Sequence, residues 1–223
     1  MIRHSDLNQH QSHTLLKRLF KIVAPRPLLA AVRDYREIDA NKRATYVRLR
    51  MLRWLRLRRD RPKVSARARR FLFICYGNIM RSPMAAALLR RRVANDGGTA
   101  AIESAGTNAR PGRSAEPRAI AAAVAHGISL DEHGATLVTE EAMRTADVVF
   151  AMDYRNETEL VHRFPWAEDR IALLGAFALD GCVDASIPDP YSQDDATLEE
   201  CYARLVVAVD AVARQLDGST ERT

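Results

Sequence analysis

The sequence predicts an α/β fold: a four-stranded parallel sheet flanked by helices and preceded by a basic, partly helical N-terminal extension. Two observations lead to this prediction. From Phe71 onward, short apolar runs alternate with segments of helical periodicity, which is typical of a parallel sheet that helices cover on both faces. Before Phe71, basic residues dominate and apolar residues recur at helical spacing.

The predicted elements follow one another without an internal repeat. The predicted strands are FLFIC (71–75), AIESAG (101–106), DVVFAM (147–152) and RIALLG (170–175). The predicted helices are 83–93, 115–126, which Gly127 closes, 154–163 and 197–216. The last helix carries an apolar seam of Leu198, Tyr202, Leu205, Val209, Val212 and Leu216. The binding crevice of such a sheet lies at the carboxyl ends of the strands, where Cys75 stands.

Charge divides the 223-residue chain into two parts. The net charge is +6, but residues 1–70 hold 20 Lys and Arg against 5 Asp and Glu, whereas residues 71–223 hold 14 against 23. We therefore expect a basic extension over 1–70 and an acidic folded domain over 71–223. The chain has no run of about 18 apolar residues, no recognisable secretory signal and an odd number of cysteines. These features predict a cytoplasmic protein.

One loop carries the residues for covalent chemistry. Cys75 ends the first predicted strand, Arg81 follows six positions later, and Ser82 with the next proline is expected to begin a helix as its N-cap. Between them, Gly77 and Asn78 are the residue types that most easily adopt positive φ. Such a loop can turn its backbone N–H groups inward at a helix N-terminus and bind an anion.

A phosphate monoester fits a loop of this kind. The predicted phosphate-binding residues are Tyr76, Gly77, Asn78, Ile79, Met80 and Arg81. The positive surroundings favour the thiolate form of Cys75, which is the predicted nucleophile. The planar fork of Arg81 can hold two phosphate oxygens through the transition state, which a lysine could not do. Ser82 can donate a hydrogen bond to the thiolate or to the departing phosphate.

The loop resembles the signature of the low-molecular-weight protein tyrosine phosphatase family. The resemblance continues through Ser104-Ala105-Gly106-Thr107, Met152-Asp153 with Asn156, and Asp189-Pro190-Tyr191, and covers about residues 71–216. It implies a four-stranded parallel sheet and hydrolysis of phosphotyrosine through a phosphocysteine intermediate, with no metal and no cofactor. It also implies that the Asp-Pro motif supplies the general acid.

Asp189 is therefore the predicted general acid. A tyrosyl leaving group has a pKa near 10 and departs poorly as an anion, so it needs a proton. The same carboxylate can later deprotonate the water that hydrolyses the phosphocysteine. Tyr191 is expected to line the slot for the substrate ring, and Tyr76 to lie at its rim. The Asp-Glu-His run at 131–133 is expected to be a solvated turn and not a metal site, because no further His or Cys lies at ligand spacing.

Three other functions compete on this scaffold. An arsenate reductase needs two further cysteines close together, whereas Cys182 and Cys201 are 19 residues apart. Protein arginine phosphatases resemble this loop but have Thr where Ile79 stands, and the apolar residue favours an aromatic ester. An inactive phosphotyrosine-binding module would not need nucleophile, clamp and acid together. The family often has a second cysteine where this chain has Met80, so an oxidised Cys75 lacks an adjacent thiol.

The resemblance makes a tyrosine-phosphorylated protein the expected partner, with a bacterial tyrosine kinase as one candidate. Residues 14–60 carry a separate hypothesis. In a first stretch, 15–23, and a second, 47–57, apolar residues at helical spacing alternate with basic ones; in the second, Val47, Met51, Trp54 and Leu55 share one side. This composition predicts attachment to an anionic membrane at its inner face. Docking of this segment onto the acidic domain is an equally favoured hypothesis. Two further alternatives are a disordered arm and translation that truly starts at Met51. Nucleic acid is not an expected partner.

Overall fold

The computed structural model describes residues 26–58, 64–65, 67–178 and 184–216. The chain divides into two compact units between Asp39 and Ala40. The first unit contributes helix α2 (Arg26–Glu37), and the second contains the sheet. The predicted amphipathic stretch at 15–23 lies outside the described residues. Within the described part of the chain, no helix is long and apolar enough to cross a membrane.

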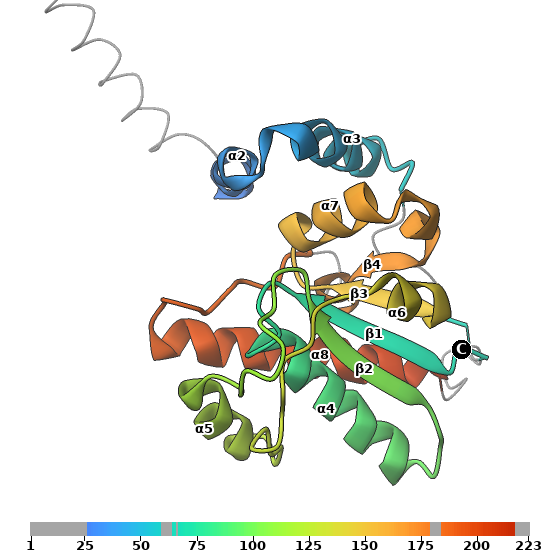
Figure 1. The fold of residues 1–223 in the computed structure, drawn as a ribbon, viewed down its shortest axis with the longest axis vertical. Helices are drawn as coiled ribbons and strands as arrows, with labels where there is room; N and C mark the ends of the chain where they lie inside the picture. The colour runs from blue at the N-terminus through green and yellow to red at the C-terminus, as the bar shows by residue number, and fades with distance from the viewer. Residues whose placement is uncertain (1–25, 59–63, 66, 179–183, 217–223) are drawn as a thin grey trace, which may run out of the picture. The chain divides into compact units, whose positions relative to one another are not determined.

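The second unit is built on a four-stranded parallel sheet with the order β2-β1-β3-β4 (Figure 1). The strands are β1 (Arg70–Cys75), β2 (Ala101–Gly106), β3 (Val148–Ala151) and β4 (Ile171–Leu173). All four predicted strands and their parallel arrangement are confirmed. β1 lies in the interior of the sheet and pairs Cys75 with Gly106 of β2. Its carboxyl end therefore opens between two neighbouring strands, the position where such sheets bind ligands.

Helices cover both faces of this sheet. Helices α4 (Arg81–Asn95) and α8 (Asp195–Leu216) cover one face, and α5 (Pro117–Ala125) packs against α8. Helices α6 (Glu140–Thr145) and α7 (Tyr154–Arg163) lie on the other face (Figure 1). Short 3-10 helices follow α7 and β4 as η2 (Pro165–Arg170) and η3 (Leu174–Ala178). The predicted helices are confirmed, and α6 is an addition whose six residues are too few to show a helical period.

The strand and helix patterns explain this layering. Phe71 and Phe73 join the core beneath α4 and α8, whereas Leu72 alternates to the opposite face. In α8, the predicted seam is buried from Leu198 to Val212 and half-buried at its last residue. Both faces of β1 are therefore apolar, which explains why the strand appears in the sequence as an unbroken apolar run.

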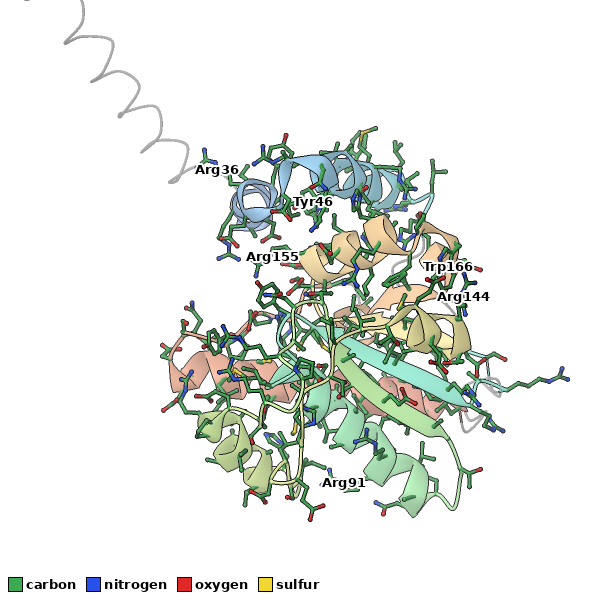
Figure 2. The ribbon with its side chains drawn as sticks, viewed as in Figure 1. Arg36, Tyr46, Arg91, Arg144, Arg155 and Trp166 are labelled. Atoms are coloured by element: carbon green, nitrogen blue, oxygen red, sulfur yellow. The ribbon has the colours of Figure 1, made fainter. Side chains whose placement is uncertain are left out.

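A further helix from the basic part of the chain packs on the outside of α7. This helix, α3 (Arg43–Trp54), follows the short η1 (Ala40–Lys42). Tyr46 and Leu49 are buried on the side of α3 that faces α7, and Figure 2 shows Tyr46 on that side. The predicted boundary between extension and catalytic domain falls where β1 begins, yet α3 belongs to the same compact unit as the sheet.

Candidate active site

The loop between β1 and α4 surrounds the sulfur of Cys75. Cys75 is buried at the end of β1, and the backbone N–H of Asn78 donates to its Sγ at 3.2 Å. The Ser82 hydroxyl lies 3.0 Å from the same sulfur. The loop thus aims a backbone N–H and a hydroxyl at the sulfur, a setting that stabilises negative charge there.

Asn78 organises this loop through its side chain as well as its backbone. It has φ of 53°, the left-handed conformation predicted for it, whereas Gly77 does not have positive φ. The buried Asn78 amide nitrogen donates to Ser82 Oγ at 2.8 Å and to Ser104 Oγ at 2.9 Å. Its oxygen accepts from the backbone N–H of Thr136 at 2.8 Å. The Asn78 amide therefore has hydrogen-bond partners in three segments, α4, β2 and the loop at Thr136, and these contacts fix the turn around Cys75.

Ser82 is not the helix N-cap that the sequence predicted, but it lies beside the Cys75 sulfur as expected. Helix α4 begins at Arg81 with Met80 at the N-cap, so Ser82 is not the cap and lies inside the first helical turn. Because its oxygen already accepts from the Asn78 amide, the hydroxyl proton is free for the Cys75 sulfur at 3.0 Å or the carbonyl of Ala105 at 3.3 Å. Pro83 still lies in the first turn of α4, where backbone N–H groups have no partner within the helix, so its missing N–H costs no helical hydrogen bond.

Arg81 is fully buried and is held by two carboxylates. Its Nη1 donates to Asp153 Oδ2 at 2.6 Å and to the carbonyl of Ile187 at 3.2 Å, and its Nη2 donates to Asp189 Oδ2 at 2.6 Å. Burial by itself lowers the pKa of the guanidinium, but Asp153, Asp189 and Cys75 outweigh it and raise the pKa above its ordinary value. Arg81 is therefore a permanent cation with a fixed plane at the floor of the site.

Asp153 reaches Arg81 from the start of α7. As the N-cap of that helix, it accepts the backbone N–H of Asn156 on Oδ1 at 2.7 Å and uses Oδ2 for Arg81. Asp189 contacts the other terminal nitrogen of the guanidinium, and its Oδ1 accepts the backbone N–H of Tyr191 at 3.2 Å. One carboxylate is thus fixed by a helix, and the other lies on a loop that has no regular structure.

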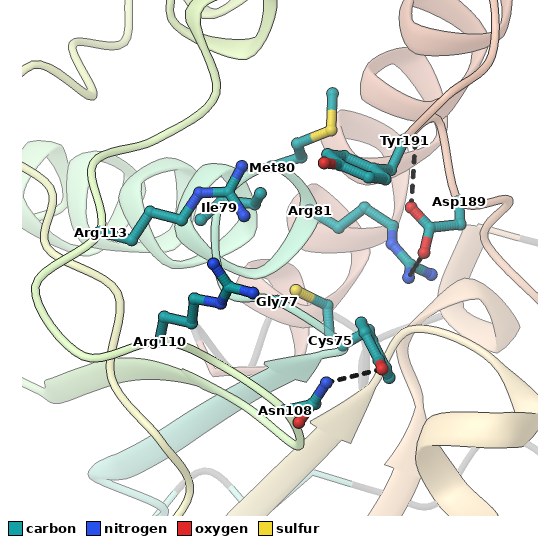
Figure 3. A pocket seen from close by; sticks show the side chains of 11 residues that line it. Cys75, Gly77, Ile79, Met80, Arg81, Asn108, Arg110, Arg113, Asp189 and Tyr191 are labelled. Atoms are coloured by element: carbon teal, nitrogen blue, oxygen red, sulfur yellow. Dashed lines mark hydrogen bonds and ion pairs between the residues drawn. The ribbon is translucent and has the colours of Figure 1, made fainter.

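These side chains open into one pocket of about 390 Å³, shown in Figure 3. The pocket is lined by Cys75, Tyr76, Gly77, Ile79, Met80, Arg81, Asn108, Arg110, Arg113, Asp189 and Tyr191. Tyr191 lies beside Arg81 on the Asp189 wall, and the half-exposed Tyr76 accepts a 2.6 Å hydrogen bond from Asn108 through its hydroxyl. Every predicted site residue except Asn78 and Ser82 lines this pocket, and those two contact Cys75 from behind it.

Several residues that support the loop were not assigned a role from the sequence. His133 was expected in a solvated turn, but it is half-buried and its Nε2 lies 2.7 Å from the carbonyl of Asn78. Gly106 lies under the loop, where a Cβ would come within 2.5 Å of the Tyr76 carbonyl and 2.9 Å of the Asn78 nitrogen. The position of Gly106 at the end of the second strand could have indicated this role, whereas the His133 contact depends on tertiary packing.

Of the other two cysteines, Cys182 lies outside the described residues. Cys201 is buried in α8 and free. Burial, against the opposing effect of the Arg81 charge, raises the pKa of its thiol to about 12. At neutral pH Cys201 is therefore a protonated packing residue and not a reactive thiolate.

A strand-end thiol, an anion-binding loop and a buried arginine at a helix start belong to the cysteine-dependent phosphatases. Comparison with known proteins identifies the family within this class. The model of the low molecular weight phosphotyrosine protein phosphatase family matches residues 70–222. The chain belongs to this family.

Relatives include both tyrosine and arginine phosphatases. A probable low molecular weight protein-tyrosine-phosphatase EpsP of Ralstonia nicotianae is 34% identical over 140 residues, 63% of this chain and 90% of the relative. A protein-arginine-phosphatase of Bacillus subtilis is 32% identical over 139 residues, 60% of this chain and 92% of the relative. The structure of the tyrosine phosphatase Wzb from Escherichia coli K30 with sulphate has 33% identity and a TM-score of 0.60, covering 66% of this chain and 96% of that one.

Proposed function

We propose that this protein hydrolyses phosphotyrosine in proteins through a phosphocysteine intermediate, using only groups of its own chain. The observation that carries the proposal is the convergence of Cys75, Arg81 and Asp189 on one pocket. In the first step the Cys75 sulfur forms a bond to phosphorus, the bond from phosphorus to the tyrosyl oxygen breaks, and Asp189 protonates that oxygen. In the second step water attacks phosphorus, Asp189 takes its proton, and the sulfur departs as thiolate with release of inorganic phosphate.

Arg81 couples substrate binding to the acid. In the described structure its Nη2 donates to Asp189 Oδ2 at 2.6 Å, while Asp153 and the Ile187 carbonyl hold Nη1. A phosphate dianion that binds in the loop competes for Nη2, because that donor faces the more exposed of the two carboxylates. The exchange leaves the guanidinium in place and frees Asp189 to carry the proton that the leaving oxygen needs.

The pocket favours phosphotyrosine over phosphoarginine. Ile79 contributes an apolar wall, and Tyr191 contributes an aromatic one. Arg110 and Arg113 add positive charge at the same pocket, which disfavours a substrate whose own side chain is a guanidinium. The presence of an arginine phosphatase among the relatives makes this discrimination worth measuring directly.

The test compares one phosphotyrosine peptide with one phosphoarginine peptide, with and without vanadate. We expect a higher kcat/KM for phosphotyrosine and inhibition by vanadate. Cys75→Ser and Arg81→Lys should each reduce kcat by orders of magnitude, with thermal melting as the check on folding. Higher kcat/KM for phosphoarginine would reassign the substrate, and turnover that survives in Cys75→Ser would refute the mechanism.

We propose a tyrosine-phosphorylated protein of the cytoplasm as the partner, with a bacterial tyrosine kinase as the candidate, because EpsP and Wzb are named tyrosine phosphatases. A pull-down with the Asp189→Ala variant, which should bind substrate without releasing it, would identify this partner. Recovery of proteins that carry phosphate only on arginine or serine would contradict the assignment.

A second proposal concerns attachment of residues 14–60 to an anionic membrane surface. Its support is an outward apolar surface on and after α3, where Trp54 is 82% exposed and Leu57 73% exposed. In liposome flotation at low salt, Trp54→Ser combined with Leu57→Ser should release the bound protein. Val124→Ser, which removes an exposed apolar residue on α5, should not. Full-length protein that stays with the unbound fraction on anionic vesicles would rule out the attachment.

A further inference from the structure

A β-turn, Arg110-Pro111-Gly112-Arg113, forms part of the pocket wall opposite Asp189. Its closing hydrogen bond runs from the N–H of Arg113 to the carbonyl of Arg110 at 3.1 Å. Proline at the second position and a glycine with φ of 78° at the third define a type II turn. Because the first and last Cα atoms of a β-turn lie within about 7 Å, the two arginine side chains start from neighbouring points.

The backbone of this turn is anchored to the rest of the site. Ala135 accepts the N–H of Gly112 and donates its own to the carbonyl of Arg113, each at 2.8 Å. Upstream, the N–H of Asn108 donates to the carbonyl of Tyr76 at 2.9 Å, which ties the segment to the phosphate-binding loop itself. The two arginines are therefore carried by a fixed support, and less backbone entropy is lost when they bind a ligand.

Both guanidinium groups are available for a ligand. Arg110 and Arg113 are exposed, and within the described ranges neither side chain is paired with a carboxylate or another hydrogen-bond partner. Arg81, in contrast, already donates hydrogen bonds to two carboxylates and a carbonyl. In Figure 3 the two side chains extend from their turn over Cys75 and Ile79, across the pocket from Asp189.

Arg110 and Arg113 add two exposed positive charges to the pocket, separate from the groups that bind the substrate phosphate. In the proposed reaction the substrate phosphate binds at the floor, to the loop N–H groups and to the Arg81 Nη2 that it takes over from Asp189. Two further arginines at the mouth, which have no partner among the described residues, match a second anion at a short distance from the first. Arginine is the residue whose planar fork suits carboxylate and phosphate oxygens alike.

We propose that Arg110 and Arg113 form a second anion subsite, which selects phosphotyrosine segments that carry another anionic side chain nearby. The inference rests on the proposed phosphotyrosine hydrolysis and names its substrate class. The shared chemistry of the second group is an oxyanion, and it can come from the carboxylate of Asp or Glu or from a second phosphate. A simple steering field would raise the association of every phosphorylated peptide, whereas a subsite discriminates between their neighbouring residues.

The test measures kcat/KM for phosphotyrosine peptides that differ only in the residues flanking the phosphotyrosine. One peptide carries Glu, one phosphoserine as a second phosphate that is not itself a substrate, one Ala and one Lys. We expect an anionic peptide to exceed the Ala peptide by about three- to tenfold, the effect of two partly exposed charge pairs. The larger of the Glu and phosphate ratios identifies which oxyanion the subsite prefers.

Variants assign the preference to the turn. In Arg110→Ala/Arg113→Ala the ratio of anionic to Ala peptide should fall to about one, and in Arg110→Glu/Arg113→Glu the Lys peptide should become the better substrate. Arg92→Ala removes an exposed arginine near the far end of α4 and should keep the wild-type ratio. Equal kcat/KM for anionic and Ala peptides in the wild type would overturn the subsite and leave the phosphatase function intact. A preference that survives in both double variants would also overturn it, whereas absence of turnover on every peptide would refute the proposed function itself.

Discussion

The Asp189 carboxylate changes partners during the proposed reaction. This exchange predicts how loss of the carboxylate should affect kcat/KM. Asp189 is bound to Arg81 in the described structure and becomes the proton donor only when phosphate takes that donor. In Asp189→Asn no proton is available for the leaving oxygen, so the loss in kcat/KM should grow with the pKa of the leaving phenol. A series of aryl phosphates measures the slope. Equal loss across the series would remove Asp189 from the acid role.

Met80 leaves Cys75 without a neighbouring thiol, and the structure adds that Cys201 is a poor substitute. Cys201 is buried, and burial raises the pKa of its thiol to about 12. Oxidised Cys75 should therefore pass from sulfenic to sulfinic acid, and activity lost to peroxide should return poorly with dithiothreitol. Met80→Cys should restore the recovery. Full recovery of the wild type would show that Cys182 or Cys201 forms the protecting disulfide.

Among individual residues, the sequence predicted those that line the pocket better than those that hold the loop in place. Cys75 and Arg81 are recognisable because the phosphate-binding loop fixes their types and spacing, and Asp189 because its Asp-Pro-Tyr motif resembles that of the family. The contacts of Asn78 with Ser104 and Thr136 are formed only when three segments meet, so no local pattern contains them. The sequence predicted Ser82 as a helix N-cap because a Ser-Pro pair looks the same whether the serine caps the helix or lies inside its first turn.

Among the elements, α3 and α7 form a connected support for the site. The guanidinium of Arg53 makes two hydrogen bonds, of 2.7 and 2.6 Å, to Glu157 of α7, and Arg58 adds a third at 3.0 Å. Arg50 lies 4.1 Å from the ring centroid of Tyr154. The same helix α7 begins at Asp153, which holds Arg81. The basic segment therefore reaches the phosphate clamp through one helix.

Glu157 is the residue whose loss should be felt most strongly at this interface. Its side chain is 1% exposed, and Glu157→Gln would remove the buried carboxylate that Arg53 and Arg58 share, while Arg58 keeps its ion pair with Glu168. We expect a loss of about 3 kcal/mol in the free energy of unfolding, measured with urea. Arg48→Ala breaks an ion pair to Glu168 whose arginine is 48% exposed, and it should cost less than about 1 kcal/mol. Similar losses for the two variants would show that α3 does not depend on the buried pair.

The sequence predicted a helix in this part of the chain and could not determine which side would face the protein. An apolar stripe beside basic residues usually indicates that the apolar side is covered. Here Met51 and Trp54 are exposed, and Arg53 turns inward because α7 and η2 present Glu157 and Glu168 to it and its neighbours. The acidic residues that turn the basic side of this segment toward the protein lie more than 100 positions away in the sequence.

For the whole molecule, the division of charge between the two parts of the sequence has a structural counterpart. Residues 1–70 are basic and residues 71–223 acidic, and residues 42–58 form ion pairs with Glu157, Glu159 and Glu168. This observation supports docking onto the acidic domain, one of the two hypotheses that the sequence favoured equally. The basic residues in these ion pairs are neutralised by the acidic domain, so other basic residues would have to bind an anionic lipid surface.

The central claim is that the phosphoryl group passes through the sulfur of Cys75. Asp189→Asn with p-nitrophenyl phosphate isolates this step, because the good leaving group needs no proton while hydrolysis of the intermediate loses its base. Rapid quenching followed by mass spectrometry of the Cys75 peptide should reveal a phosphoryl group on sulfur, with a burst of nitrophenol equal to the enzyme present. A phosphoryl group on any other residue, or turnover near the wild-type rate in Cys75→Ala, would contradict the mechanism.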